Sequence, residues 1–330
     1  MKRKNRLSIQ EYKDGILSGN RVILSRAITL VESALDDDNE LAAKLINEIY
    51  PYTGNSYRIG ITGVPGVGKS TFIESFGAYL IEQNKKLAVL TIDPSSQKSG
   101  GSILGDKTRM EKLSVSSHAF IRPSPAGDAL GGVAHKTRET MLLCEAAGYD
   151  VIFIETVGVG QSETAVKNMV DFFLLLMLAG AGDELQGIKK GIMEMADSIA
   201  ITKADGNNLD ASRQAKKEYQ NALHLFPSNE NGWNPQVLLC SALQNKGLED
   251  TWKILTDYYF KMKQNGFFDF NRKEQSVHWM HQTINLYLKR NFYNRPEIIE
   301  KLATFEDAVR SGKKHSVQAA RELLSFQVNN

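Results

Sequence analysis

RIGITGVPGVGKST, residues 58–71, is the part of this sequence from which the fold can be worked out first. Ile59–Thr62 is short and contains β-branched apolar residues, which predicts a buried strand. Gly63–Ser70 then fits the pattern G-x4-G-K-[ST], and a helical segment begins after it. In such a loop the glycines let backbone N–H groups turn inward around a polyphosphate, and the helix N-terminus adds a partial positive charge. The stretch therefore predicts a site for a nucleoside triphosphate.

Two side chains of this loop have direct chemical roles in the prediction. Lys69 would reach the β- and γ-phosphate oxygens, and the Ser70 hydroxyl would ligate Mg²⁺. The residues predicted to contact the nucleotide at this loop are Gly63, Gly66, Val67, Gly68, Lys69, Ser70 and Thr71.

Outside the loop, apolar runs alternate with helical segments. Strands are predicted at residues 86–93, 119–122, 150–155, 171–178, 198–202 and 236–241, with helices over 133–147 and 247–263. Continuous apolar runs are typical of parallel strands that are buried on both faces. Polar, glycine-rich loops mostly follow the strands, and ligands of open α/β sheets bind at that edge. The predicted fold class is α/β, with a mostly parallel sheet as the core of a P-loop NTPase.

Helical patterns flank this core at both ends. Residues 8–50 carry apolar residues at three- and four-residue spacing, and the acidic DDDNE at 36–40 is expected to be a loop between two helices. After Gly266 the pattern predicts helices over 271–292, 296–310 and 314–326. The predicted domains are an N-terminal helical extension over 1–55, a P-loop core over 56–265 and a C-terminal helical arm over 266–330.

Bulk properties exclude several classes of protein. The 330 residues carry a net charge of +2, so charge indicates no nucleic-acid or membrane partner. No apolar signal region follows the basic opening MKRKNR, and the longest apolar run, 172–182, is too short to span a bilayer. The two cysteines form neither a disulfide framework nor a CxxC metal pair. We therefore expect a cytoplasmic protein.

Acidic residues near the ends of the predicted strands indicate a metal site. Asp93, Asp106 and Glu155 could hold Mg²⁺ or its waters, as hydrolysis of a triphosphate requires. Glu155 begins the sequence E-T-x-G, in the place of the D-x-x-G of a nucleotide switch, so the N–H of Gly158 would sense the γ-phosphate. An acid that only caps a turn is the alternative at each position. The predicted metal ligands are Ser70, Asp93, Asp106 and Glu155.

Two further loops indicate which base is bound. Thr202-Lys203-Ala204-Asp205 is similar to the N-K-x-D signature of GTPases, whose carboxylate accepts hydrogen bonds from two N–H groups of guanine. Thr202 stands where Asn is usual, which puts in question the hydrogen bond that ties this loop to the phosphate loop. Ser241-Ala242-Leu243 matches the loop whose backbone contacts the guanine carbonyl. The sequence therefore favours GTP over ATP, with nucleotide contacts at Lys203, Asp205, Ser241, Ala242 and Leu243.

Five segments together resemble one family. They are GVPGVGKST at 63–71, DPSSQKSGGSILGDKTRM at 93–110, ETVGVGQSE at 155–163, AGAGDELQGIKKGIMEMAD at 179–197 and TKAD at 202–205. This combination is similar to the MeaB/ArgK family, which comprises GTPases associated with methylmalonyl-CoA mutase in the signal-recognition-particle-like branch of P-loop GTPases. The resemblance covers about residues 8–330, and the second and fourth segments are specific to the family.

The resemblance implies a homodimeric, Mg²⁺-dependent GTPase that acts as a chaperone of a cobalamin-dependent acyl-CoA mutase. It would gate adenosylcobalamin loading and protect or reactivate the mutase. Residues 94–109 and 156–163 would be two switches, and 179–190, with Gln186 and Lys189, a third that communicates with the mutase. The C-terminal helices resemble the family's dimerisation arm. The implied catalytic residues are Lys69, Asp93, Asp106, Glu155 and Lys189.

Alternatives to this function stay open at the level of sequence. They are a metallochaperone GTPase of the hydrogenase or urease maturation type, an ATPase or kinase accessory to basic amino-acid transport, and a nucleotide-binding scaffold without hydrolysis. Val159, rather than a catalytic glutamine, follows Gly158, which predicts slow intrinsic hydrolysis that a mutase accelerates.

Overall fold

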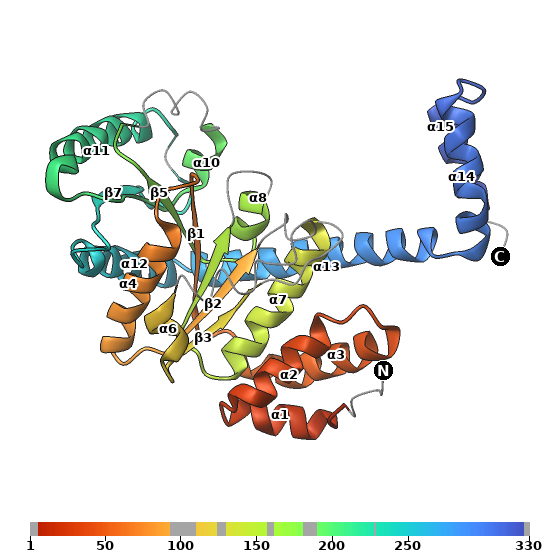
Figure 1. The fold of residues 1–330 in the computed structure, drawn as a ribbon, viewed down its shortest axis with the longest axis horizontal. Helices are drawn as coiled ribbons and strands as arrows, with labels where there is room; N and C mark the ends of the chain where they lie inside the picture. The colour runs from red at the N-terminus through yellow and green to blue at the C-terminus, as the bar shows by residue number, and fades with distance from the viewer. Residues whose placement is uncertain are drawn as a thin grey trace. The chain divides into compact units, whose positions relative to one another are not determined.

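A seven-stranded parallel sheet forms the centre of this protein, for which we obtained a computed structural model (Figure 1). The structure describes residues 6–92, 110–123, 130–156, 162–180, 190–227 and 229–326. The chain divides into two compact units, Met1–Gln275 and Ser276–Asn330, and the sheet lies in the first. The expectation of an α/β fold is confirmed, and the sheet is parallel at every described pairing rather than mostly parallel.

The strands run in the order β3-β2-β4-β1-β5-β6-β7, so β1 is central, between β4 and β5. Because both faces of the central strands are covered, their side chains are buried throughout, as the continuous apolar runs predicted. The bounds are β1 Tyr57–Gly63, β2 Leu87–Ile92, β3 Ala119–Arg122, β4 Val151–Thr156, β5 Phe172–Met177, β6 Ser198–Ile201 and β7 Gln236–Leu239.

The helix that follows the phosphate loop, α4 (Lys69–Glu82), packs tightly on the sheet. Its Phe76 ring stacks on Phe153 of β4 at 5.5 Å between ring centroids. A Cβ atom added at Gly77 would lie 2.7 Å from a methyl carbon of Leu87 in β2, so a larger residue there would require the neighbouring side chains to shift. The remaining helices of this core are α6 Glu111–Val115, α7 Leu130–Ala146, α8 Ser162–Lys167, α10 Lys190–Met195, α11 Leu209–Leu223 and α12 Leu248–Gln264, with 3₁₀ turns η1 Tyr50–Tyr52 and η2 Gly206–Asn208.

Helix α11 has no counterpart among the helices that the sequence predicted. Its sequence is mostly polar, and only a narrow stripe, Ser212, Ala215 and Tyr219, is buried. That stripe follows the three- and four-residue spacing of a helix face, which was the available signal.

The N-terminal helices α1 Ile9–Leu17, α2 Arg21–Val31 and α3 Asp36–Ile49 pack against one another and against α7. The expectation of a loop at 36–40 is wrong, because these acids form the first turns of α3. Acidic side chains are favourable at a helix N-terminus, where the unpaired N–H groups carry partial positive charge. Asp38 is in addition buried and ion-paired with Arg6.

The C-terminal helices are α13 Phe267–Tyr293, α14 Pro296–Arg310 and α15 Ser316–Ser325. Within the second unit α14 and α15 contact each other, with the Lys301 ammonium 3.7 Å from the centroid of the Phe326 ring. No helix in the described ranges is sufficiently long and apolar to cross a membrane.

Candidate functional site

The phosphate loop joins the end of β1 to the start of α4 at the carboxyl edge of the sheet (Figure 1). Gly66 and Gly68 have φ angles of +79° and +90°, which favour glycine. Gly63 is required for a different reason: a Cβ atom there would lie 2.5 Å from the carbonyl oxygen of Leu176. Each predicted glycine therefore has a structural role in forming the loop.

Lys69 lies at the first turn of α4 with its ammonium turned back into the loop. Its Nζ donates to the carbonyl oxygen of Gly63 at 2.7 Å and approaches that of Val64 at 3.5 Å. Burial lowers the pKa of Lys69, and the nearby charges of Glu155 and Glu163 act in the opposite direction. The loop thus already holds a cation where the sequence predicts the β- and γ-phosphates.

Glu155 lies near the end of β4, beside the end of β1. Its side chain is buried, and the register pairs Glu155 with Ile61. The next residue, Thr156, donates from its hydroxyl to the Thr62 hydroxyl at 2.7 Å, and both are fully buried. This bond fixes the start of the predicted second switch to the start of the phosphate loop. The sequence motifs did not single out Thr62 or Thr156 in that role.

Thr202, which stands where Asn is usual, contacts the phosphate loop. Its hydroxyl lies 2.7 Å from the carbonyl oxygen of Val67 in the phosphate loop and 3.2 Å from that of Met177. A hydroxyl has one proton, so the shorter contact to Val67 is the better hydrogen bond. Threonine therefore ties the base loop to the phosphate loop, the connection that was in doubt without Asn.

The other predicted base contacts gather at the ends of β6 and β7. Lys203, in a left-handed conformation with φ +55°, donates from Nζ to the carbonyl oxygen of Gly66 at 2.9 Å. The Ser241 hydroxyl donates to the Asp205 carboxylate. Asn208, which no motif indicated, donates from its amide to the Lys203 carbonyl at 2.8 Å. Lys203, Asp205 and Ser241 are thus brought to one edge with the phosphate loop, although they lie far apart in sequence from Lys69.

Two of the four predicted metal ligands, Asp93 and Asp106, lie outside the described residues. So do Gly158, predicted to sense the γ-phosphate, and Lys189, predicted to be catalytic. Among the residues that the structure does describe, no group of three His, Cys, Asp or Glu side chains is close enough to hold a metal ion. Ser70 and Glu155 are described, and their oxygens are the hard ligands that Mg²⁺ prefers. The described residues therefore fit a phosphate-bound Mg²⁺ that takes only part of its ligands from the protein.

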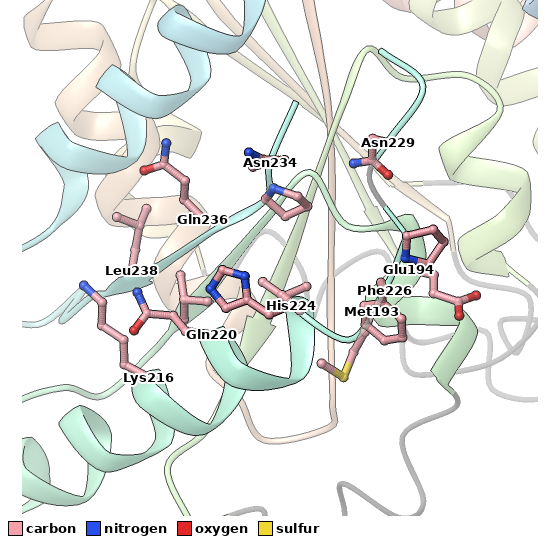
Figure 2. A pocket seen from close by; sticks show the side chains of 14 residues that line it. Met193, Glu194, Lys216, Gln220, His224, Phe226, Asn229, Asn234, Gln236 and Leu238 are labelled. Carbon is pink, nitrogen blue, oxygen red and sulfur yellow. The ribbon is translucent and has the colours of Figure 1, made fainter. Parts of the chain in front are cut away.

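A cavity of about 770 Å³ lies away from this edge (Figure 2). Gln236 and Leu238 line it from β7, and Lys216 and Gln220 from α11. Since Gln236 begins β7 while Ser241 follows its end, the cavity is distinct from the predicted base site.

Comparisons with known proteins agree with this geometry. The family model described as "Methylmalonyl Co-A mutase-associated GTPase MeaB" matches residues 24–297. The chain is 49% identical to the GTPase ArgK of Escherichia coli over 84% of this chain and 83% of that protein. It is 43% identical to the mitochondrial methylmalonic aciduria type A homolog of Mus musculus, over 97% of this chain and 80% of that protein.

A solved structure described as a LAO/AO transport system kinase superposes with a TM-score of 0.77 and 37% identity, covering 99% of both chains. The loop geometry and these matches confirm the resemblance, the P-loop fold and the use of GTP, GDP and Mg²⁺. The chain belongs to the MeaB family of methylmalonyl-CoA mutase-associated GTPases and is a GTP-hydrolysing enzyme.

Proposed function

We propose that this GTPase is the chaperone of a cobalamin-dependent acyl-CoA mutase of the methylmalonyl-CoA type. In this role it gates the loading of adenosylcobalamin and protects or reactivates the mutase in the cytoplasm. The observation that carries the proposal is the family match over residues 24–297, whose description names association with this mutase. The name of the mouse relative, which refers to methylmalonic aciduria, supports the same client.

In the proposed site the phosphate loop binds the triphosphate and Lys69 contacts its β- and γ-phosphates. Backbone N–H groups of Gly66, Val67, Gly68 and Thr71 complete the contacts. To reach the phosphates, the Lys69 ammonium exchanges its bonds to the loop carbonyls for bonds to charged oxygens, which are stronger. Asp205 accepts from guanine, and the backbone of Ala242 and Leu243 faces its carbonyl.

Hydrolysis is attack of water in line with the γ-phosphate. Mg²⁺, held by Ser70 and by Asp93, Asp106 and Glu155 directly or through water, would supply neutralisation of the developing charge. Lys69 and Lys189 add positive charge, and the N–H of Gly158 senses the γ-phosphate. Catalysis of this kind consists of positioning and electrostatics, so ordering of the switches by the mutase would set the rate.

The proposed active form is a homodimer formed through the C-terminal arm. Val277, Met280, Ile284, Tyr287 and Leu288 on α13 are all about half exposed in the single chain. The first four of them are three and four residues apart, as in a coiled-coil seam, and Leu288 lies four residues after Ile284, so a second copy of the arm could cover this face. No nucleic acid or membrane takes part in the proposed function.

Turnover with and without the cognate mutase tests the proposal. We expect GTP hydrolysis to be slow alone and to rise at least about tenfold with the mutase, since the partner supplies ordering. A complex should coelute on gel filtration in the presence of a non-hydrolysable GTP analogue. Fast hydrolysis that the mutase leaves unchanged, with no complex, would contradict the proposal.

A second candidate is an accessory kinase of a transport system, because the superposed structure carries that description. Nucleotide choice separates the two functions. The chaperone prefers GTP and releases phosphate to water, whereas a transport kinase that prefers ATP would transfer it to a protein. Phosphate release measured with GTP and with ATP distinguishes these outcomes.

A further inference from the structure

The loop after β7 is a closed turn rather than an open segment. Ser241 and Lys246 exchange two backbone hydrogen bonds, each 3.0 Å long. The Ser241 hydroxyl also accepts from the N–H of Gln244 at 3.2 Å. Gly247 closes the turn with a φ of +76°, and a Cβ atom there would lie 2.2 Å from the Leu239 carbonyl oxygen. The backbone at Ala242 and Leu243 is therefore held by its own turn on one side.

On the other side, one side chain of α4 holds the same turn. The Ser75 hydroxyl donates to the carbonyl oxygen of Ala242 at 2.9 Å, across 167 positions of sequence. The N–H of Asn245 approaches that carbonyl at 3.3 Å. Ser75 lies on the helix that begins with Lys69, so it joins the phosphate-binding helix directly to the turn after β7.

Fixing this carbonyl also fixes an N–H direction. In a planar trans peptide the C=O and the next N–H point in opposite directions. With the Ala242 carbonyl directed at Ser75, the Leu243 N–H is directed away from α4. The Leu243 side chain is largely exposed, so it does not constrain this orientation.

We propose that Ser75 is a specificity-determining positioning residue, which orients the Ala242–Leu243 peptide for recognition of the oxygen at position 6 of guanine. The proposal rests on the placement of the base at this turn under the proposed function. Asp205, bonded by Ser241, recognises the N–H groups of the base, including the 2-amino group. Ser75 and Asp205 thus act on different atoms of the base, which makes their effects separable.

Three nucleoside diphosphates separate the contribution of the 6-oxygen from that of the 2-amino group. GDP carries both the 6-oxygen and the 2-amino group. Inosine diphosphate keeps the 6-oxygen but lacks the 2-amino group, and 2-aminopurine riboside diphosphate lacks the 6-oxygen together with the N1–H. For Ser75→Ala we expect the Kd of GDP and of inosine diphosphate to rise together by about three- to tenfold, the effect of one hydrogen bond. The Kd of the 2-aminopurine nucleotide should not change, and Ser75→Thr should restore the wild-type values.

Asp205→Asn is the matched control, because it should reduce the preference for GDP over inosine diphosphate. Equal weakening of all three nucleotides by Ser75→Ala, or none, would overturn the role of Ser75 while leaving the base site intact. Wild-type protein that binds GDP and the 2-aminopurine nucleotide equally would instead refute the base site itself. Titration calorimetry provides each of these constants.

Discussion

The two ends of β1 are held by different chemistry. At its amino end Arg58 forms a paired contact with Glu145, at 2.8 and 2.9 Å, in which both side chains are almost fully buried. Beside it Asp171 accepts from the Tyr259 hydroxyl at 2.8 Å and from the Arg272 guanidinium at 2.6 and 2.8 Å. At the carboxyl end, Thr202 and two lysines donate to backbone carbonyls of the phosphate loop, and the Thr156 hydroxyl donates to the Thr62 hydroxyl.

The amino end of β1 therefore contributes mainly to the stability of the fold, and its carboxyl end contributes mainly to nucleotide binding. The buried ions at the amino end already have partners, so they contribute to the fixed geometry of the sheet. At the carboxyl end Lys69 and Lys203 donate to neutral carbonyls, and for Lys69 a bound phosphate would be a stronger acceptor. Substitutions at the amino end should therefore mainly lower stability, and those at the carboxyl end should mainly lower nucleotide affinity.

The largest effect is expected when the buried ion pair is broken. Glu145→Ala leaves the Arg58 guanidinium buried without its carboxylate and also removes the acceptor of the Gly54 N–H. We expect the free energy of unfolding to fall by about 3–5 kcal/mol. Asp257→Ala, which breaks an exposed ion pair with Lys253, should change the stability very little, because water screens this pair, and it is the control. Urea unfolding measures the loss of stability in both variants. If Glu145→Ala lost as little stability as Asp257→Ala, the buried ion pair would not be what stabilises the amino end of β1.

A smaller effect is expected at the other end of the strand, on binding. Thr202→Val keeps the shape of the side chain but removes the hydroxyl that binds the Val67 carbonyl. We expect the Kd of GDP to rise by about 5- to 30-fold, the cost of a buried acceptor left unpaired. Thr202→Asn should restore affinity, since Asn offers a donor. Thr29→Val, on an exposed face of α2, controls for the loss of a hydroxyl. An unchanged Kd of GDP for Thr202→Val would show that the hydrogen bond from Thr202 to Val67 does not support nucleotide binding.

The smallest effect concerns pH at the amino end. Burial by itself would raise the pKa of Asp171, but the charge and hydrogen bonds of Arg272, with Arg58 and Tyr259, outweigh it and lower that pKa. A lowered folded pKa gives stability that is present above the unfolded value, about 3.9, and is lost as pH falls through the folded value. The stability difference between wild type and Asp171→Asn should thus shrink as the pH falls from 5 to 3. A difference that grows on acidification would contradict the lowered pKa.

Much of the fold could be predicted, because its signals are local. The strand at 119–122 was predicted with its observed bounds, and the other six predicted strands all exist. The failures also have local causes. The acids at 36–40 suit both a solvated loop and the first turn of a helix, and their role in α3 depends on packing against α2 and α7. Helix α11 was missed because its buried stripe is narrow.

The candidate site divides in the same way. The phosphate-loop residues and Asp205 follow from motifs, since their chemistry requires fixed spacing. Thr62, Ser75 and Asn208 belong to no such motif, and Thr156 lies in E-T-x-G, which did not indicate its bond to Thr62. The roles of these four residues became visible only through their hydrogen bonds in the folded chain.

The sequence by itself determined the nucleotide class, the parallel sheet and the family of this protein. Those properties follow from glycine positions, apolar periodicity and short motifs, which act over a few residues. Only the tertiary structure decided how Thr202 replaces Asn and how Ser75 reaches the turn after β7. Such hydrogen bonds depend on distances between strands and helices that the chain sets only when it folds. The geometry of the site is for that reason a property of packing, whereas its chemistry is a property of sequence.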